Sequence, residues 1–191
     1  GWTNSNTTNQ VTTNIVGSQD EPKTSKTIAS YISQNEENCI GKRFNDISEK
    51  SSFGKLLYPL VDRKCIYQEL PGAFEAKKSL TYREALINTM RYFDIAPTNG
   101  TSHFLDIPLW DSMQWYALVA ERKWIISGSH AHPEHIMTRE ELADLIVKVA
   151  DAPKNPSQLR IYPDVNTLNP YYSPIQDYAF LIQDRWGKFY P

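Results

Sequence analysis

Internal repetition constrains the fold of this chain more than any other feature of its sequence. Three short strings share the pattern aromatic residue, any residue, Asp, β-branched residue, and they cover residues 44–47, 104–107 and 162–165. Their aspartates are Asp46, Asp106 and Asp164, so the strings recur at nearly equal intervals. This spacing predicts a chain of similar units, each opened by one of the strings.

Two further pairs of similar segments indicate that one sequence unit has been duplicated. Residues 114–117, Gln-Trp-Tyr-Ala, reappear as Gln-Asp-Tyr-Ala at residues 176–179. Residues 62–66, Asp-Arg-Lys-Cys-Ile, match Glu-Arg-Lys-Trp-Ile at residues 121–125. We therefore expect three repeats within one domain of residues 23–191. Their approximate bounds are residues 42–98, 102–152 and 160–191.

The second half of each of the first two repeats begins with helix-capping chemistry. Residues 81–84 and 138–141 both fit the Thr-x-x-Glu capping box, in which the Thr side chain and the Glu side chain each satisfy a backbone N–H at the helix start. Further helices are expected from Trp110 or Met113 to Lys123 and from Ser173 to about Asp184. Apolar residues at helical spacing follow each box. They are Leu86, Met90 and Phe93 in the first repeat, and Leu142, Leu145, Ile146 and Val149 in the second.

The N-terminal segment has a different composition from the repeats. Asn, Thr, Ser and Gln supply 21 of its first 38 residues, so it has little apolar surface to bury against its ordering entropy. We expect residues 1–22 to form an extended polar arm, or a simple linker. Ile28, Tyr31 and Ile32 then predict a short amphipathic helix within residues 24–37.

The second repeat carries the most specific motifs. Its opening is followed by an Ile-Ile-Ser-Gly turn at residues 125–128, a loop with Pro133, and a Thr-Arg-Glu-Glu-Leu-Ala helix start at residues 138–143. These motifs resemble the S-layer homology domain, and the similarity runs from about Lys42 to the C-terminus. The first repeat departs from the family pattern in three places. It has Tyr82 where Arg is expected, Arg83 one place later, and Ala76 instead of the loop proline.

The resemblance implies an all-α fold, a pseudo-threefold arrangement of helix-loop-helix S-layer homology repeats. Such domains bind cell-wall polysaccharide in the grooves between their prongs. The third repeat stops at Pro191, before a second helix of its own. We expect the helix at residues 24–37 to complete it and to close the ring, although a chain cut within the third repeat would have the same sequence.

The resemblance also implies a set of ligand-binding residues. A guanidinium at a helix start can form paired bonds to a carboxylate or to a ketal-linked pyruvate. Structural roles are the alternative to ligand binding. Arg139 would then be an exposed charge at a helix start, and the core would contain Trp110, Trp115 and Trp124. The set that the resemblance implies is Arg139, Asp106, Trp110 and Gly128 in the second repeat, with Asp46 and Arg83 in the first.

We predict no enzymatic activity and no cofactor. The repeated acids Asp46, Asp106 and Asp164 stand just before helices, where a carboxylate serves better as a helix-start cap than as a general acid. The chain has no GxSxG, HExxH or GxGxxG motif. Three imidazoles, those of His130, His132 and His135, lie close enough in sequence to suggest a metal site, but a solvated polar loop is the preferred interpretation. His103 is expected at the rim of a site.

Cys39 and Cys65 are the only cysteines, and no CxxC or histidine set accompanies them. In an oxidising compartment a bridge between them would contribute about 3 to 4 kcal/mol, whereas a reducing compartment would leave two free thiols. Joined to the resemblance, the pattern predicts a disulfide and an extracellular protein. Cys65 also stands where other repeats have Trp124 and Trp186, so we expect the bridge to offset a void left by the smaller side chain.

The sequence therefore predicts a non-catalytic module, secreted to the cell surface, that anchors a protein to cell-wall polysaccharide. The expected partner is this polysaccharide, with or without pyruvyl groups, or another polymer that is linked to peptidoglycan. An alternative is a structural subunit of an extracellular assembly, a surface layer or filament, that contacts itself or other surface proteins. A net charge of -2 does not favour nucleic acid. No apolar run approaches the roughly 20 residues that span a membrane.

Overall fold

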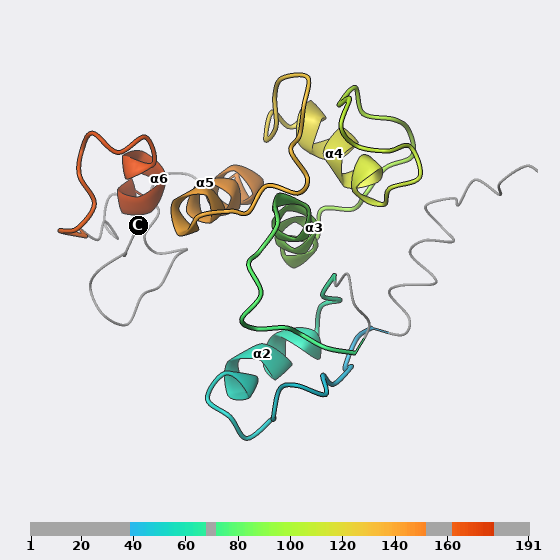
Figure 1. The fold of residues 1–191 in the computed structure, drawn as a ribbon, viewed down its shortest axis with the longest axis vertical. Helices are drawn as coiled ribbons and strands as arrows, with labels where there is room; N and C mark the ends of the chain where they lie inside the picture. Colours follow the sequence, from blue (N-terminus) through green and yellow to red (C-terminus); the bar gives the residue numbers. More distant parts are fainter. Residues whose placement is uncertain (1–38, 68–71, 152–161, 178–191) are drawn as a thin grey trace, which may run out of the picture.

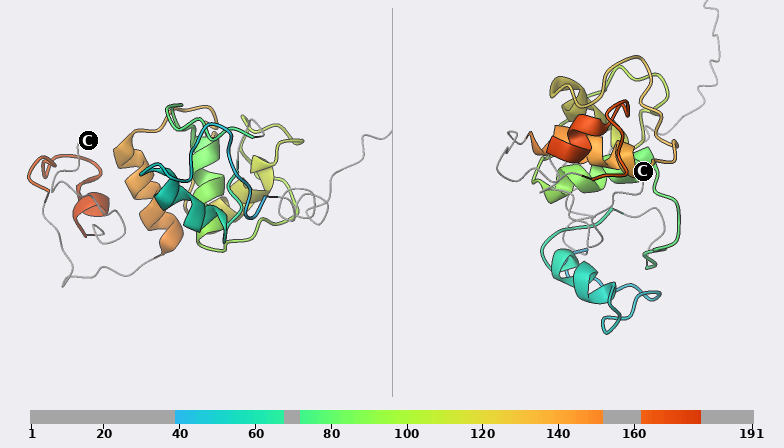
Figure 2. Two further views of the ribbon diagram at one scale, coloured as in Figure 1. Left: turned by 90° about the horizontal axis from the view of Figure 1, so that it is seen from below. Right: turned by 90° about the vertical axis from the view of Figure 1, so that its left-hand side faces the viewer.

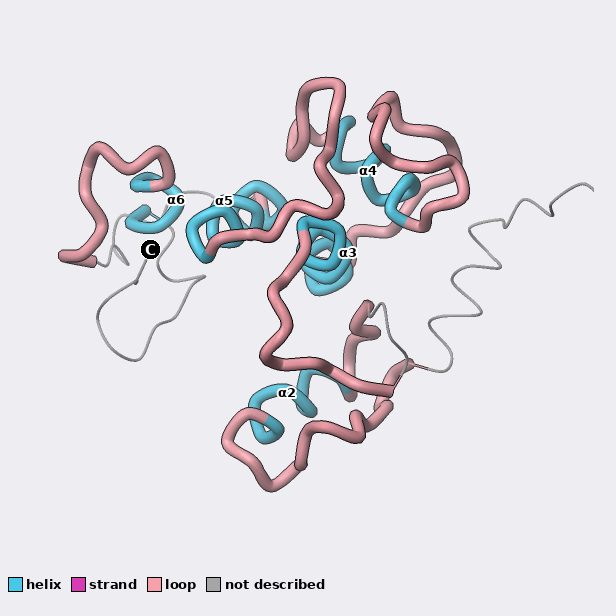
Figure 3. Tube along the Cα trace, viewed as in Figure 1, coloured by secondary structure: helices cyan, strands magenta, loops and turns pink. Residues whose placement is uncertain are grey.

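The computed structural model describes residues 39–67, 72–151 and 162–177, and the regular elements in these ranges are helices (Figure 1). Long loops join them (Figure 3). One isolated antiparallel bridge, between Thr81 and Ile136, is the only extended pairing in these ranges. The all-α prediction is thus confirmed for the described residues. The helices are α2 (Gly54–Val61), α3 (Tyr82–Tyr92), α4 (Met113–Arg122), α5 (Arg139–Ala150) and α6 (Tyr172–Asp177).

Several predictions concern residues outside the described ranges. They are the polar arm at residues 1–22, the helix at residues 24–37, and the part of the last helix beyond Asp177. The expected ring closure joins two of these segments.

The two capping boxes form as predicted. Thr81 is the N-cap of α3 and Thr138 is the N-cap of α5, and in each box the hydroxyl accepts the N–H of the Glu three residues later. The Glu side chain in turn accepts the N–H of the Thr, at 3.1 Å for Glu84 and 2.7 Å for Glu141. Local chemistry therefore determines where both helices begin.

A polar residue precedes the first helix of each repeat, and it lies five positions after the repeated Asp. In the second repeat this places the start at Met113 rather than at Trp110. The side chain of the polar residue accepts a backbone N–H at the helix entry, which satisfies an otherwise orphan donor. These bonds run from the Gly54 N–H to Ser51 Oγ (2.9 Å), from the Met113 N–H to Asp111 Oδ1 (2.8 Å) and from the Tyr171 N–H to Asn169 Oδ1 (2.8 Å).

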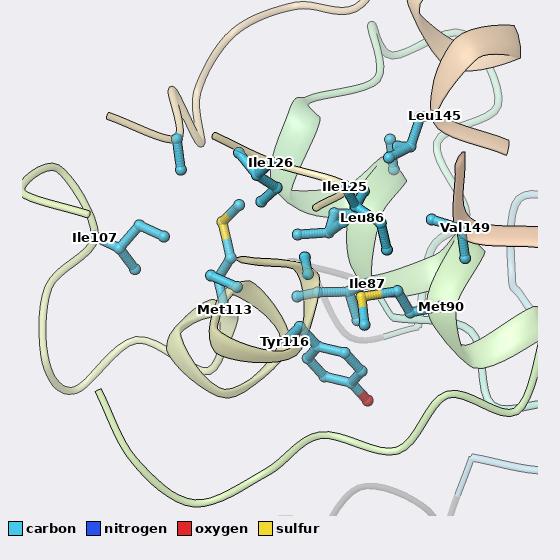
Figure 4. Close-up of a cluster of buried hydrophobic side chains, with 14 of the residues drawn as sticks. Leu86, Ile87, Met90, Ile107, Met113, Tyr116, Ile125, Ile126, Leu145 and Val149 are labelled. Atoms are coloured by element: carbon cyan, nitrogen blue, oxygen red, sulfur yellow. The ribbon is translucent and has the colours of Figure 1, made fainter. Parts of the chain in front are cut away.

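The main hydrophobic core surrounds α3, which packs against both α4 and α5. Leu86, from α3, and Met113, from α4, are fully buried within it (Figure 4). Tyr116 is buried there as well, and its hydroxyl accepts a hydrogen bond from Arg91 Nε at 3.0 Å. Because the polar end of the buried tyrosine is satisfied, it can lie in the core without an orphan group.

Helix α2 lies apart from this core, at the bottom of Figure 1 and again below the other helices on the right of Figure 2. Phe44, Leu57, Tyr58 and Val61 form its own small cluster. The predicted disulfide is present beside it, joining Cys39 to the buried Cys65 with a Cα–Cα distance of 5.3 Å.

Helix α6 lies beyond α5 and completes a third cluster with Tyr162, Val165 and Ile175. Gln176 bonds both the N–H and the C=O of Tyr162, at 2.8 and 3.0 Å. In the first repeat the hydroxyl of Tyr58 accepts the N–H of Phe44, the residue that corresponds to Tyr162, at 3.3 Å, and it donates to the Ile47 carbonyl at 2.7 Å. In both repeats a side chain 14 positions further along the chain therefore accepts the N–H of the opening aromatic residue.

Two of the three tryptophans considered as core residues are on the surface. Trp110 is 86% exposed and Trp124 is 85% exposed, whereas Trp115 is partly buried against the main core. The prediction of a void at Cys65 is therefore wrong. Cys65 is 9% exposed, so it does not occupy the space that the exposed Trp124 occupies in the second repeat, and the disulfide has no missing indole to offset.

Candidate functional site

Asp46 and Asp106 each hold the loop that leads to the second helix of their repeat. The partners lie 25 to 29 residues further along the chain, so the prediction that these two aspartates cap helix starts is wrong. Glu75 and His132, at matching places in the two loops, both have a φ of 54°. Each carboxylate accepts two backbone N–H groups. They are those of Phe74 (2.8 Å) and Glu75 (2.7 Å) for Asp46, and those of Ala131 (2.8 Å) and His132 (2.7 Å) for Asp106.

These hydrogen bonds lower the pKa of both carboxyl groups. For Asp46 the main cause is the N–H of Phe74. Burial by itself would raise the pKa of Asp106, but the N–H groups of Ala131 and His132 outweigh it, and the pKa is lowered. A carboxyl group held in this way favours the ionised form, which suits a structural clamp better than a proton donor.

Arg83, assigned to ligand binding by resemblance, is engaged in an ion-pair network. Its guanidinium pairs with the carboxylates of Asp111 and Glu134, and its side chain is 13% exposed. Burial alone would lower the pKa of Arg83, but these carboxylates raise it above the ordinary arginine value. The matching residue in α5 is Glu140, which accepts a hydrogen bond from the Asn169 amide. Equivalent positions therefore link the first repeat to the second and the second to the third.

The start of α3 runs beside the loop of the second repeat. The Tyr82 N–H donates to the His135 carbonyl at 2.8 Å, and the Arg83 N–H donates to the Pro133 carbonyl at 3.0 Å. The first N–H groups of a helix have no partner inside it. The second repeat supplies those partners, so this loop is fixed against its neighbour as well as by Asp106.

Two cavities lie at matching places in the first and second repeats. The first has a volume of about 360 Å³ and the second of about 500 Å³. Seven lining positions of the first correspond to seven of the second, each at the spacing that separates Thr81 from Thr138. The pairs are Phe74 and Ala131, Glu75 and His132, Lys78 and His135, Leu80 and Met137, Glu84 and Glu141, Asn88 and Leu145, and Arg91 and Lys148.

A basic side chain meets a carboxylate in both cavities. Lys78 Nζ lies 3.3 Å from Glu84 Oε1, and His135 Nε2 lies 2.9 Å from Glu141 Oε2. Because both glutamates are the capping-box residues of their helices, each pair has a fixed place at a helix start. Such a pair presents a donor and an acceptor side by side.

Aromatic residues form a further wall of each cavity. Tyr67 and Tyr92 line the first, while Tyr82 and Tyr171 line the second. Tyr82 belongs to the first repeat and Tyr171 to the third, so the second cavity lies where the three repeats meet. Burial, with a smaller effect from Asp144, raises the pKa of Tyr82 well above its usual value. Its hydroxyl therefore stays protonated and able to donate.

The ligand-binding residues carried over by resemblance line neither of these cavities. Arg139 is exposed at the first position of α5, and Trp110 is exposed on the loop before α4. Gly128 lines a third cavity, of about 450 Å³. Its φ of 100° explains the glycine, since nothing lies within 4 Å of the place where a Cβ would stand. The structure thus does not gather this set in any of the three cavities described.

Of the three histidines of the second loop, His130 and His132 stack on each other with 5.8 Å between ring centroids, and His135 lies in a different environment. Among the described residues, no group of three or more His, Cys, Asp or Glu side chains is placed to hold a metal ion. His130 Nδ1 lies 2.9 Å from Ser129 Oγ, while His135 contacts Glu141. The described part of the chain therefore does not assemble the metal site that the spacing suggests, and His132 and His135 instead line the second cavity.

The sequence analysis missed the matching cavities, although one signal for them was available. Extending the register of the two capping boxes in both directions pairs the cavity residues one by one. The spacing between the repeated aspartates is longer than the spacing between the capping boxes, because the first repeat has three more residues between its Asp and its loop. Alignment on the aspartates therefore does not pair the cavity residues.

Comparison with protein-family models, with curated proteins and with solved structures finds no match to the chain. Within the described ranges, no helix has the length and apolar character needed to cross a bilayer.

Proposed function

We propose that the chain is a non-catalytic, cell-surface module that anchors a protein to cell-wall polysaccharide. The observation that carries this proposal is the recurrence of one cavity, with matching basic, acidic and aromatic positions, in two successive repeats. A polymer of repeating sugars offers the same chemical unit at regular intervals, so one polysaccharide molecule can occupy two similar sites on one protein module. Once the first is filled, the second binds at a high effective concentration.

The side chains of the cavities suit an anionic sugar. Lys64, Lys78 and Arg91 line the first cavity, and the basic residues of the second are Lys148 and the two histidines of its loop. Cationic donors form strong hydrogen bonds to carboxylate groups, including ketal-linked pyruvate. The tyrosines supply flat apolar faces for pyranose rings. A pyruvylated polysaccharide fits both features.

The resemblance to S-layer homology repeats supports a pseudo-threefold arrangement with grooves between neighbours. Two observations agree with it. Equivalent positions link successive repeats through Arg83 with Asp111 and Glu140 with Asn169. The cavity of the second repeat also receives a tyrosine from each neighbour. The ring closure predicted from the sequence of residues 24–37 is part of this proposal, and those residues lie outside the described ranges.

We further propose that the protein is extracellular. The disulfide between Cys39 and Cys65 supports this location, because such bonds persist in oxidising compartments and are rare in reducing ones.

Binding of the full chain to purified bacterial cell-wall sacculi tests the function. We expect Lys78→Ala and His135→Ala each to weaken binding about tenfold and the double variant by more, since each removes from one cavity the side chain that pairs with the capping-box glutamate. The controls are Lys77→Ala and His130→Ala, which remove the same kinds of side chain from adjacent or nearby positions that do not line these cavities. Arg139→Ala tests the residue carried over by resemblance.

Sacculi whose secondary polysaccharide has been extracted with acid provide the second control. The proposal predicts that the wild-type chain no longer binds them. Undiminished binding by the double variant, or equal binding to extracted sacculi, would contradict it.

The alternative, a structural subunit of an extracellular assembly, has one observation in its favour. Leu105, Leu109 and Trp110 stand 77%, 77% and 86% exposed on one loop, an apolar surface suited to contact with another protein. Light scattering across a range of concentrations tests it, with the full chain beside one lacking residues 1–22. A monomer in both cases would remove this alternative.

A further inference from the structure

Trp124 occupies a backbone position that is unfavourable for its side chain. It follows α4 with a φ of 59°, in the left-handed region that bulky residues rarely adopt. Its indole is 85% exposed, so burial does not compensate for the strain. Asp94 and Asp151, which follow α3 and α5, have the same left-handed backbone, so the unusual feature at the end of α4 is the bulky exposed side chain and not the turn itself.

The indole stands at a cavity of about 450 Å³ at the end of α4. This volume is within the roughly 300 to 1,000 Å³ of small-molecule sites. The other residues that line it include His103, Glu121, Arg122, Ile126 and Gly128. None of these residues lines the two matching cavities.

The polar side of the cavity is fixed in place. His103 Nδ1 lies 2.5 Å from Glu121 Oε1, and His103 Nε2 lies 2.6 Å from the carbonyl oxygen of Gly128. The ring also stacks on Phe104, with 4.7 Å between centroids. Three contacts therefore hold the imidazole and the Glu121 carboxylate beside the exposed indole. The guanidinium of Arg122 forms no ion pair with the described residues and is open to a ligand.

We propose that this cavity is a sugar-binding subsite in which Trp124 stacks on a pyranose ring. One face of a pyranose carries C–H groups with a small positive charge, and the face of an indole is negative. The ring hydroxyls need both acceptors and donors, which Glu121 and Arg122 supply. The inference comes from this cavity alone and stands whether or not the two matching cavities bind polysaccharide. The first repeat has no equivalent site, because Cys65 takes the matching place and is buried in the disulfide.

Fluorine NMR of the full chain labelled with 5-fluorotryptophan tests the subsite. The probes are methyl β-D-glucopyranoside, methyl α-D-mannopyranoside and N-acetyl-D-glucosamine, each up to about 50 mM to cover millimolar affinities. Loss of one resonance in Trp124→Phe assigns the Trp124 signal, and Trp110→Phe assigns the control signal. We expect at least one sugar to shift the Trp124 resonance saturably, with no saturable shift at the equally exposed Trp110.

Trp124→Gly separates binding from folding. Glycine adopts the left-handed region readily, so the variant should keep or raise the thermal midpoint while it loses the sugar-dependent shift of the His103 Cε1–H signal. Trp124→Phe keeps a ring at the site and should retain part of the affinity, measured from the sugar-dependent shift of the His103 Cε1–H signal.

Three results would overturn the proposal: no saturable shift of the Trp124 resonance with any of the sugars, an equal shift at Trp110, or a clear fall in the thermal midpoint of Trp124→Gly. Variants Lys78→Ala and His135→Ala should leave the Trp124 shift unchanged. Sacculus binding that fails while this shift persists would therefore contradict the proposed anchoring function without affecting the subsite.

Discussion

The first and second repeats place the same kinds of contact at corresponding positions, but with different side chains. Arg43, just before the first opening, lies 2.7 Å from Asp62, while His103, just before the second, lies 2.5 Å from Glu121. The cavity pair Lys78 with Glu84 likewise becomes His135 with Glu141. The first repeat uses an arginine and a lysine where the second uses histidines, so the two repeats share a geometry but differ in chemistry.

The same two repeats also differ in how their first helices are held. Helix α4 shares the main core with α3 and α5, whereas α2 has a small cluster of its own and a disulfide. A small core buries little apolar surface, and a covalent link then supplies part of the missing stability. The loop clamps are alike in both repeats, which shows that local geometry is independent of the size of the core.

Truncation of one leucine in each core sharpens this comparison and should have the largest effect. Leu86→Ala removes a fully buried side chain from the main core, and we expect it to lower the free energy of unfolding by about 4 kcal/mol. Leu57→Ala acts on the small cluster and should lower it by about 2 kcal/mol. Urea denaturation measures both. Equal losses would mean that the two cores contribute alike.

Removal of the disulfide should act mainly on the first repeat. A loop of 26 residues predicts a loss of about 3.5 kcal/mol for the double variant Cys39→Ser and Cys65→Ser. Hydrogen exchange locates the effect: amides of α2 should lose their protection, while those of α3 and α5 keep most of theirs. Uniform loss across all helices would show that α2 and the main core unfold as one unit.

The sequence predicted those parts of the fold that depend on neighbouring residues. Thr81 and Thr138 mark true helix starts because a capping box is complete within four residues. The stripe that includes Leu86 and Met90 is buried because helical spacing alone puts those side chains on one face.

Contacts between distant residues were not predictable in the same way. Asp46 and Asp106 looked like helix caps from their place before a helix, but the loop residues that they hold lie 28 and 25 positions further along the chain. Trp124 looked like a core residue because tryptophan is usually buried, and its left-handed φ has no signal in the sequence. The candidate cavities depend on the same distant contacts.

Substitution of the clamp aspartates tests whether the two loops are held equally. Asp106→Asn leaves one oxygen to accept an N–H but turns an amide N–H toward the other donor, and we expect it to lower the free energy of unfolding by about 2 kcal/mol. Asp46→Asn should have a smaller effect because Asp46 is more exposed. Chemical denaturation at pH 7 gives both values, and a larger loss for Asp46→Asn would reverse this order.

The same clamps predict an acid dependence. A carboxyl group with a lowered pKa stabilises the folded state above its unfolded pKa of about 3.9, and that stability is lost as the pH falls through the folded pKa. We expect the wild-type chain to lose stability below about pH 4. The loss should be smaller in Asp106→Asn, and an identical acid profile for the two proteins would contradict the prediction.

The smallest expected effect is a pH dependence confined to the second repeat. The carbonyl oxygen of Gly128, and then Glu121, raise the pKa of His103 above its usual value. Protonated His103 therefore stabilises the fold fully below its unfolded pKa of about 6.5, and this contribution is lost as the pH rises through the raised, folded value. Arg43 stays charged throughout this range. The first repeat should show no such dependence.

A swap of the two residues sharpens the contrast. His103→Arg should remove the pH dependence at the end of α4, and Arg43→His should create one beside Asp62, because each variant gives one repeat the side chain of the other. The His103 Cε1–H signal, followed by NMR from pH 5 to pH 9, reports the pKa directly. In Glu121→Gln this pKa should fall only in part, since the Gly128 carbonyl is its larger cause. A wild-type pKa at or below about 6.5 would mean that the contacts of His103 with Glu121 and Gly128 do not favour its charged form.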